Sequence, residues 1–209
     1  IFEDIPFSKG SKKKIIGRSI PTKFVNIWDD PTNRLLGSYK RGSKLGYKGM
    51  CQFYAMEFMH YLKGYDYCIR LDDDSFLHSE LNIDPFIKNK LIYGYVRDKE
   101  DNHADTRRTL PPAIKEYIKS NDVKILCNKE NGISMWHHYS NFWLTDLSFW
   151  NQHTVKNYLN HIHSLRGIQR FRWGDHVIMS NALRMFCPPR KITKLQFKYE
   201  HRSHGWKNY

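Results

Sequence analysis

Residues 47–74 constrain the fold most, because a helical pattern there leads directly into a strand pattern that ends in three aspartates. Residues 47–63 are dense in Met, Phe and Ala, which predicts a buried helix closed by Gly64. Residues 65–71 are mostly apolar and predict a strand. The aspartates 72–74 follow at the carboxyl end of that strand, where ligands gather in open α/β sheets.

The rest of the chain alternates between the same two kinds of pattern. Strands are predicted at 22–30, 91–98, 140–150 and 191–201, and helices at 111–121, 151–165 and 176–186, the first of these opened by its prolines. This interleaving predicts an α/β or α+β architecture. No repeat or Gly/Ser linker divides the sequence, so residues 1–209 are expected to form one domain.

The positive charge of the chain, +13 overall, lies mainly at its two ends. Residues 1–50 hold 11 Lys and Arg against 4 Asp and Glu, and residues 190–209 hold 6 against 1. Basic ends favour a phosphate-bearing partner, although they also serve solubility alone. No apolar run approaches the ~18 residues of a membrane span, and no signal peptide opens the chain, so a soluble protein is expected. Four widely spaced cysteines predict neither a zinc site nor a disulfide framework, and they favour a reducing compartment.

Three adjacent carboxylates repel one another unless a cation lies among them. In an extended segment, Asp72 and Asp74 point the same way and converge on one ion, while Asp73 turns away. Oxygen ligands select Mn²⁺, Mg²⁺ or Ca²⁺, and a metal held this way binds a diphosphate. The alternative is a polar surface turn in which the aspartates cap the following segment.

Two other segments carry candidate site residues. Asp175 follows a Trp-Gly pair and is suited to accept a proton from a sugar hydroxyl or to bind it, or else simply to cap a helix. After the last predicted strand, His201 and His204 are candidates to complete a metal shell. Arg202 and Lys207 are candidates to bind phosphates, unless this end is only a frayed basic tail.

Several motifs in order resemble the fungal α-1,2-mannosyltransferase family. They are IFEDIPF, GYKGMCQFYAMEF, YDYCIRLDDDSF, YSNFWLTDLSFW and FRWGDHVIMSNALRMF, between residue 1 and about residue 186. The compact size and the DDD variant look most like the glycosyltransferases encoded by large algal viruses (chloroviruses). The resemblance implies a GT-A-like nucleotide-diphospho-sugar transferase fold, with a mixed central sheet flanked by helices.

The resemblance also implies roles for individual residues. Asp72, Asp73 and Asp74 match the acidic motif that binds the metal, Mn²⁺ or Mg²⁺, and the diphosphate. Tyr47 and Lys48 match a Tyr-Arg pair near the nucleotide phosphates. Asp175 matches the aspartate of the family's Trp-Gly-Asp segment, which lies on the acceptor side.

Two family residues are replaced in this chain. Trp143 stands where the family has a glutamate proposed as the nucleophile, so a double displacement on that residue is impossible. Asp146 and Asp175 are the nearest alternatives, or the reaction proceeds by front-side attack. Met179 replaces the helical histidine that serves the metal, which places more weight on His201 and His204.

The predicted function is a metal-dependent glycosyltransferase that acts with retention of configuration. It would move a sugar from a nucleotide-diphosphate donor, a UDP-sugar in preference to a GDP-sugar, to a glycan or glycoprotein acceptor. We expect no nucleic-acid partner and a cytoplasmic location, in the host cytoplasm if the protein is viral; the alternative is the Golgi lumen, as part of a longer chain. The oligomeric state stays open. Competing hypotheses are a metal-dependent nuclease or phosphodiesterase, and a basic module that binds nucleic acid or a membrane.

Overall fold

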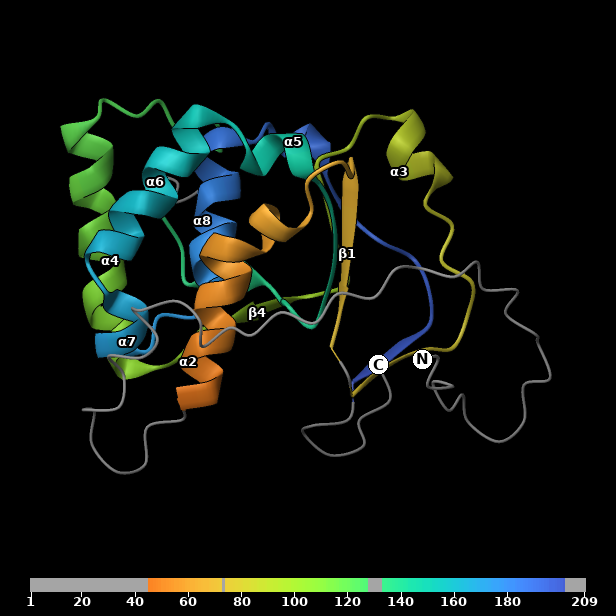
Figure 1. Cartoon of the computed structure of the whole chain (residues 1–209), viewed down its shortest axis with the longest axis horizontal. Helices are drawn as coiled ribbons and strands as arrows, with labels where there is room; N and C mark the ends of the chain where they lie inside the picture. The colour runs from red at the N-terminus through yellow and green to blue at the C-terminus, as the bar shows by residue number, and fades with distance from the viewer. Residues whose placement is uncertain (1–44, 73, 128–132, 202–209) are drawn as a thin grey trace.

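A mixed sheet forms the centre of the molecule (Figure 1). The structure, a computed structural model, describes residues 45–72, 74–127 and 133–201. Within this part, four strands pair in the order β1-β6-β3-β7, with bounds Tyr67–Leu71, Phe142–Asp146, Tyr93–Tyr95 and Ile192–Lys194. The first two pairings are antiparallel and the third is parallel. The predicted α/β class with a mixed sheet and flanking helices is confirmed.

Two short ribbons extend from the sheet and carry much of the polar chemistry. Strand β2 (Ser75–Leu77) pairs with β8 (Tyr199–His201), and β4 (Asp98–Glu100) pairs with β5 (Trp136–His138), both antiparallel. The sequence predicted one final strand over 191–201. Instead that segment divides between β7 in the main sheet and β8 in a ribbon, because its end pairs with a different partner strand.

The predicted helix at 47–63 is found as one continuous helical segment that contains three types of helix. It comprises α2 (Leu45–Gln52), the π-helical η2 (Phe53–Glu57) and the 3₁₀-helical η3 (Phe58–Tyr61). Gly64 follows with a φ of +89°, a conformation that glycine adopts at little cost.

The remaining helices are mostly where the sequence places them. They are α3 (Asp84–Lys88), α4 (Ala104–Ser120), α5 (Leu147–Trp150), α6 (His153–Ser164), α7 (Gly167–Phe171), α8 (Asp175–Phe186) and η5 (Pro189–Lys191). The prediction that prolines open the helix at 111 is wrong, since α4 begins at residue 104 and contains both prolines. Tertiary packing outweighs the local preference, because Thr106, Leu110 and Ile114 are all fully buried on one face.

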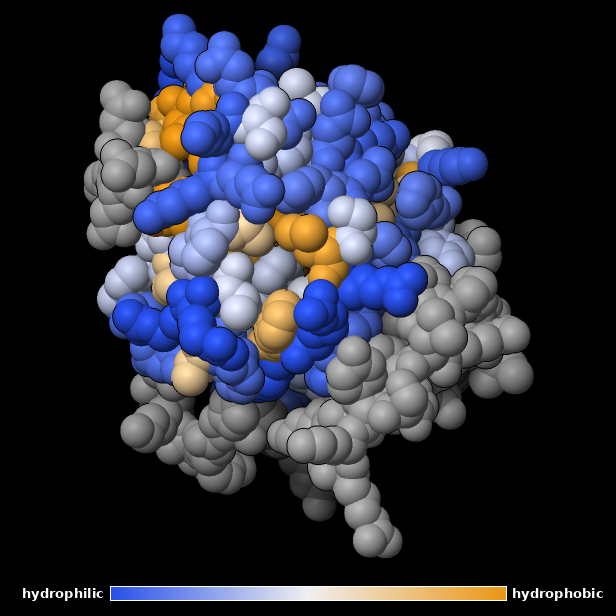
Figure 2. Space-filling model, turned by 90° about the vertical axis from the view of Figure 1, so that its left-hand side faces the viewer, coloured by the Kyte–Doolittle hydropathy of each residue, from blue (hydrophilic) through white to orange (hydrophobic). Residues whose placement is uncertain are grey.

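The core lies between the sheet and the helical layer. Figure 1 shows α2, α4, α6, α7 and α8 together on one side of β1, with α3 on the other. Strand β6 is buried along nearly its whole length, and Trp150 donates its indole N–H to Thr145 at 2.8 Å inside the core. The outward face of the helical layer is mostly hydrophilic, with few apolar side chains (Figure 2). Cys51, Cys68, Cys127 and Cys187 are free thiols in this structure.

Candidate active site

The predicted metal-binding aspartates flank a tight turn after β1. Asp72 directly follows β1, and Asp74 directly precedes β2. The backbone N–H of Ser75 donates to the carbonyl of Asp72 at 3.0 Å and closes the turn. The two carboxylates therefore converge because the chain turns between them, and not because of the extended-strand alternation that the sequence suggested.

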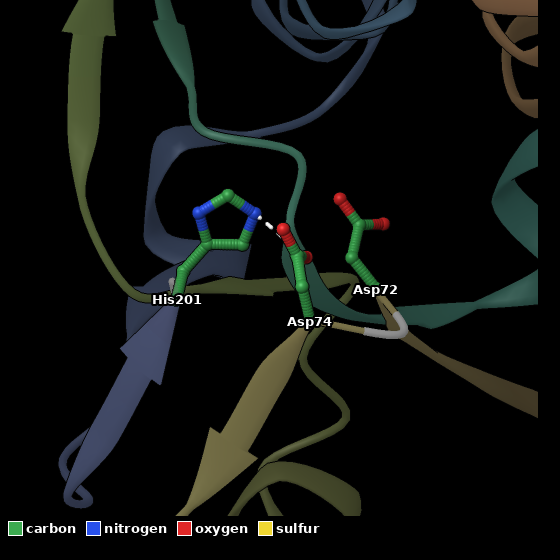
Figure 3. A group of neighbouring side chains, drawn as sticks. All are labelled: Asp72, Asp74 and His201. Carbon is green, nitrogen blue, oxygen red and sulfur yellow. Dashed lines mark ion pairs between the residues drawn. The ribbon is translucent and has the colours of Figure 1, made fainter. Parts of the chain in front are cut away.

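His201 reaches these aspartates through the β2–β8 ribbon. It is the last residue of β8 and lies opposite Ser75 in the antiparallel register. Its Nε2 atom is 3.0 Å from Asp74 Oδ1. Figure 3 shows the imidazole and the two carboxylates side by side, with His201 coming from β8 and the aspartates from the segment between β1 and β2. One ligand atom from each of the three residues lies within 4.8 Å of the others.

Asn141 closes the group from the main sheet. It precedes β6, and the β1–β6 pairing continues past the strand ends because Asp72 donates its backbone N–H to the Asn141 carbonyl at 3.0 Å. The Asn141 side-chain amide donates to Asp72 Oδ2 at 3.1 Å and lies 2.6 Å from His201 Nε2. Its Oδ1 atom is buried and has no hydrogen-bond partner among the described residues.

This donor set fits a divalent cation such as Mn²⁺ or Mg²⁺. Two carboxylates supply hard oxygen ligands, and an imidazole adds a nitrogen ligand. Burial raises the pKa of Asp72 although the neighbouring Arg70 lowers it, so an additional positive charge here would stabilise the carboxylate.

Arg70 links the candidate metal ligands to the interior of a cleft of about 930 Å³. The side chain is on β1 and is 4% exposed. Its Nε donates to Asp72 Oδ1 at 2.8 Å, and its Nη1 donates to Asp175 Oδ2 at 2.6 Å. The guanidinium also stacks on the Tyr54 ring, 3.6 Å from the centroid. Arg70 thus fixes the orientation of two cleft carboxylates at once.

Asp175 is the first residue of α8 and lines the cleft. The N-cap position belongs to Gly174, so the simpler interpretation of Asp175 as a helix cap is wrong. Its carboxylate is 1% exposed and faces Arg70. Burial alone would raise the pKa of Asp175, but Arg70 and His176 lower it well below the usual range. The carboxylate is therefore ionised and paired, an arrangement that suits positioning more than nucleophilic attack.

Tyr47 and Lys48, the two residues predicted near the nucleotide phosphates, point in different directions. Tyr47 lines the cleft, with the Arg172 guanidinium 4.7 Å above its ring. Lys48 instead directs its ammonium to the Gln169 carbonyl at 2.7 Å and does not line the cleft. The predicted phosphate role for Lys48 therefore has no geometric support, because the next residue along a helix points about 100° away.

The structure does not bring Asp146 to the cleft. Asp146 ends β6 and accepts a hydrogen bond from the Ser148 backbone N–H at 2.8 Å, which caps α5. It pairs with Tyr67 at the start of β1, whereas Asp72 follows the other end of that strand. The predicted catalytic role for Asp146 is thus corrected to a helix cap. Four other predicted residues lie outside the described part of the chain: Asp73, Arg202, His204 and Lys207.

Several cleft residues carry no sequence signal strong enough to single them out: Arg70, Asp101, His137, Arg172 and His176. Arg70 gave the best clue, because it is a charged residue inside an otherwise apolar strand. Asp101 directly follows β4, His137 is in β5, Arg172 directly follows α7, and His176 is in the first turn of α8, so only the fold brings them together.

The two family positions that differ in this chain are core positions. Trp143 is fully buried in β6, and Met179 is 1% exposed in α8. The indole N–H of Trp143 is buried and has no partner among the described residues. These side chains extend the apolar core under the cleft, so neither provides a nucleophile or a metal ligand.

The chain is similar in sequence to several fungal mannosyltransferases. A model of the glycolipid 2-alpha-mannosyltransferase family matches residues 11–204. The probable mannosyltransferase MNT3 of Candida albicans is 29% identical over 161 residues, which cover 72% of this chain and 42% of the relative. The glycolipid 2-alpha-mannosyltransferase of Saccharomyces cerevisiae is 27% identical over 184 residues, covering 82% and 41%. The chain thus spans about two fifths of the length of these relatives.

These relatives correct one expectation from the sequence. The predicted cytoplasmic location is wrong, because it conflicts with the similarity to these fungal mannosyltransferases. Separately, none of the helices between residues 45 and 201 that the structure describes combines the length and apolar character needed to cross a bilayer.

Two solved structures share the fold. The mannosyltransferase Ktr4p of S. cerevisiae in complex with GDP has a TM-score of 0.69 at 24% identity, covering 84% of this chain and 50% of its own. Core-mannan synthase A of Aspergillus fumigatus, in a Mn/GDP form, has a TM-score of 0.67 at 24% identity, covering 88% and 56%. The predicted GT-A-like fold is confirmed, whereas the preference for UDP-sugars finds no support. Because the family model matches nearly the whole chain, this protein belongs to the glycolipid 2-alpha-mannosyltransferase family.

Proposed function

We propose that this chain is the catalytic unit of a glycosyltransferase that moves a mannosyl group from GDP-mannose to a glycan or glycoprotein acceptor. Family membership supports the mannosyl group. The GDP and Mn/GDP forms of two structural relatives support the guanosine diphosphate and Mn²⁺. We place the reaction in the Golgi lumen, and we expect residues 1–209 to act as one catalytic domain.

The observation that carries this proposal is the convergence of Asp72, Asp74 and His201 on one point of the cleft. These three residues would hold the Mn²⁺ ion. The bound ion supplies positive charge that stabilises the diphosphate leaving group. Around it, Arg70 and Asn141 each hydrogen-bond one oxygen of Asp72, so the carboxylate is fixed before any ligand arrives. Such preorganisation lowers the cost of binding and of reaching the transition state.

The remaining roles follow from position in the cleft. Tyr47 and Arg172 form a wall that combines an aromatic ring with a cation, suited to the nucleotide part of the donor. Asp175 acts through Arg70 as a positioning residue. We expect retention of configuration without a double displacement at position 143, since Trp143 is a buried core residue.

A two-metal nuclease is disfavoured by the same geometry. Two-metal phosphodiester chemistry needs a second set of ligands close to the first. Among the residues that the structure describes, no second group of three or more His, Cys, Asp or Glu side chains gathers at metal-binding distance.

The test is calorimetric titration of GDP and UDP, each with and without Mn²⁺, followed by transfer from GDP-mannose to methyl α-mannoside. GDP should bind only weakly without Mn²⁺ and more tightly than UDP with it. Asp74→Asn and His201→Gln should remove the metal dependence. Matched controls are Asp98→Asn and His138→Gln, because these residues form a carboxylate–imidazole pair of 2.7 Å outside the cleft. Metal-independent binding of GDP, or equal effects in the control pair, would refute the proposal.

A further inference from the structure

The β4–β5 ribbon presents one of its faces to the cleft. Lys99 lies directly opposite His137 in the antiparallel register, and alternate side chains of a strand share a face. Accordingly Lys99, Asp101, His137 and Tyr139 all line the cleft. Their strand neighbours Asp98 and His138 pair with each other on the opposite face. The cleft therefore has a second polar wall, separate from the metal ligands.

The first turn of α8 joins this wall through His176. Its Nε2 atom lies 3.6 Å from Asp101 Oδ2, and its Nδ1 lies 3.4 Å from Asp175 Oδ1. Burial lowers the pKa of His176, but the two carboxylates outweigh burial and raise it overall. The His176 imidazole thus lies between two carboxylates, and Asp101 is held in place, with its Oδ1 also accepting from the His103 backbone N–H at 2.8 Å.

His137 offers a second acceptor, its Nε2 atom. Its side chain is 2% exposed, and its ring lies 4.0 Å from the His176 ring. Nδ1 is 3.2 Å from the Met135 carbonyl, which can only accept, so Nδ1 carries the proton. Burial lowers the pKa of His137 to about 3, and the ring is therefore neutral. Nε2 is then a lone-pair acceptor, and it is buried without a hydrogen-bond partner among the residues that the structure describes.

We propose that Asp101 and His137 form a subsite that binds the hydroxyl groups of a hexose. Both residues offer acceptors, a carboxylate oxygen and an imidazole nitrogen, and hydroxyl groups donate to both. Phosphate oxygens cannot donate, so Asp101 and His137 are unsuited to the diphosphate, which belongs at the candidate metal ligands. An unpaired buried acceptor is costly, and a sugar hydroxyl would satisfy it. The inference rests on the proposed function, and either the donor hexose or the acceptor hexose would supply this chemistry.

The experiment measures binding of three probes to the Mn²⁺-loaded protein: GDP, GDP-mannose and methyl α-mannoside. Asp101→Asn keeps the size of the side chain and removes its negative charge. His137→Gln removes the imidazole ring and keeps a polar side chain at that position. Asp98→Asn and His138→Gln, on the other face of the same ribbon, are matched controls. Circular dichroism establishes that each variant is folded.

We expect the Asp101 and His137 variants to weaken hexose binding roughly 10- to 100-fold, while GDP affinity stays within about twofold. Weaker methyl α-mannoside binding identifies the acceptor sugar. Weaker GDP-mannose binding at constant GDP affinity identifies the donor sugar. Unchanged binding of both sugars, an equal loss of GDP affinity, or no detectable hexose binding by the wild type would overturn the subsite. Failure of the wild type to bind GDP with Mn²⁺ would instead refute the proposed function, since GDP carries no hexose.

Discussion

Replacing Asp175 with asparagine should destabilise the protein strongly while hardly changing side-chain size. The substitution removes the charge that faces Arg70 Nη1 at 2.6 Å. Arg70 and Asp175 are 4% and 1% exposed, so water cannot replace the lost partner. Arg70 would still pair with Asp72, but it would lose the second of its two carboxylate partners. The asparagine amide keeps one acceptor oxygen but replaces the other with an NH2 group, which cannot accept from Arg70 or His176.

The expected cost is about 3–5 kcal/mol, the range for breaking a buried ion pair by removing one partner. A typical domain has only about 5–15 kcal/mol of stability in total. For a chain of this size, each kcal/mol corresponds to roughly 2–4 °C in Tm. Asp175→Asn should therefore lower Tm by roughly 6–20 °C.

The effect has a defined pH dependence. In the folded state Arg70 and His176 outweigh burial and hold the pKa of Asp175 below that of an unfolded aspartate. A carboxyl group with a depressed folded-state pKa contributes its stability above the unfolded pKa, about 3.9, and loses it as the pH falls toward the folded value. The difference between wild type and Asp175→Asn should therefore be full at pH 7 and shrink below about pH 4.

Urea unfolding followed by tryptophan fluorescence measures the cost at pH 7, pH 5 and pH 3.5. Asp105→Asn is the matched control, because Asp105 pairs with Arg108 at 3.1 Å where both side chains are more than half exposed. That surface pair should cost no more than about 1 kcal/mol. A loss for Asp175→Asn equal to the control, or one that is as large at pH 3.5 as at pH 7, would show that the buried pair does not stabilise the fold as argued.

Three further predictions concern the candidate metal ligand, a packing contact and a buried imidazole. Mn²⁺ and GDP at about 100 times Kd should raise Tm by roughly 5–11 °C, and His201→Ala should lose most of this shift in a thermal melt; an unchanged shift would exclude His201 as a ligand. Gly167→Ala should cost about 1–3 kcal/mol in urea unfolding, because the new Cβ would lie 2.1 Å from the Trp173 ring; a neutral result would mean that the ring moves aside freely. Because burial lowers the pKa of His137 to about 3, stability should fall as the pH drops from 6.5 to 4, by up to about 1.4 kcal/mol per pH unit from this group; His137→Asn should flatten that slope, and an identical slope would count against a buried neutral ring.

The sequence predicts the fold well where periodicity and tertiary packing agree. The helices at 151–165 and 176–186 and the strand before Asp72 are found close to their expected bounds. It fails where a long-range partner decides the outcome. The prolines of α4 favour a helix start, but burial of Leu110 and Ile114 extends the helix seven residues upstream of them. The 191–201 segment alternates like a single strand, yet its two ends pair with strands in different sheets.

For the site, the sequence identifies residues whose neighbours are local and misses those assembled by topology. Asp72 and Asp74 stand together in the chain, and their acidity alone suggests a cation. His201 is predictable only as one of two C-terminal histidines, and the register of β8 against β2 places it beside Asp74. Asp101 and His176 are 75 residues apart, and no local pattern relates them. Lys48 and Asp146 were assigned by position in the chain, but side-chain direction takes them away from the cleft.

The burial of Met179 has a physical consequence for the candidate metal site. Met179 is buried in α8, and the described ligand set takes its imidazole from His201 of β8. Asp74 precedes β2 and His201 ends β8, so a ribbon of only three residue pairs sets the distance between them. The Ser75–Tyr199 hydrogen bond of 2.8 Å and the contact of Asn141 with His201 connect this ribbon internally and to the main sheet. A cation bound by residues on both strands would therefore stabilise the ribbon as well as the diphosphate, because ligand binding to the folded arrangement alone adds to its stability. Tighter metal binding should therefore go together with a more stable β2–β8 ribbon.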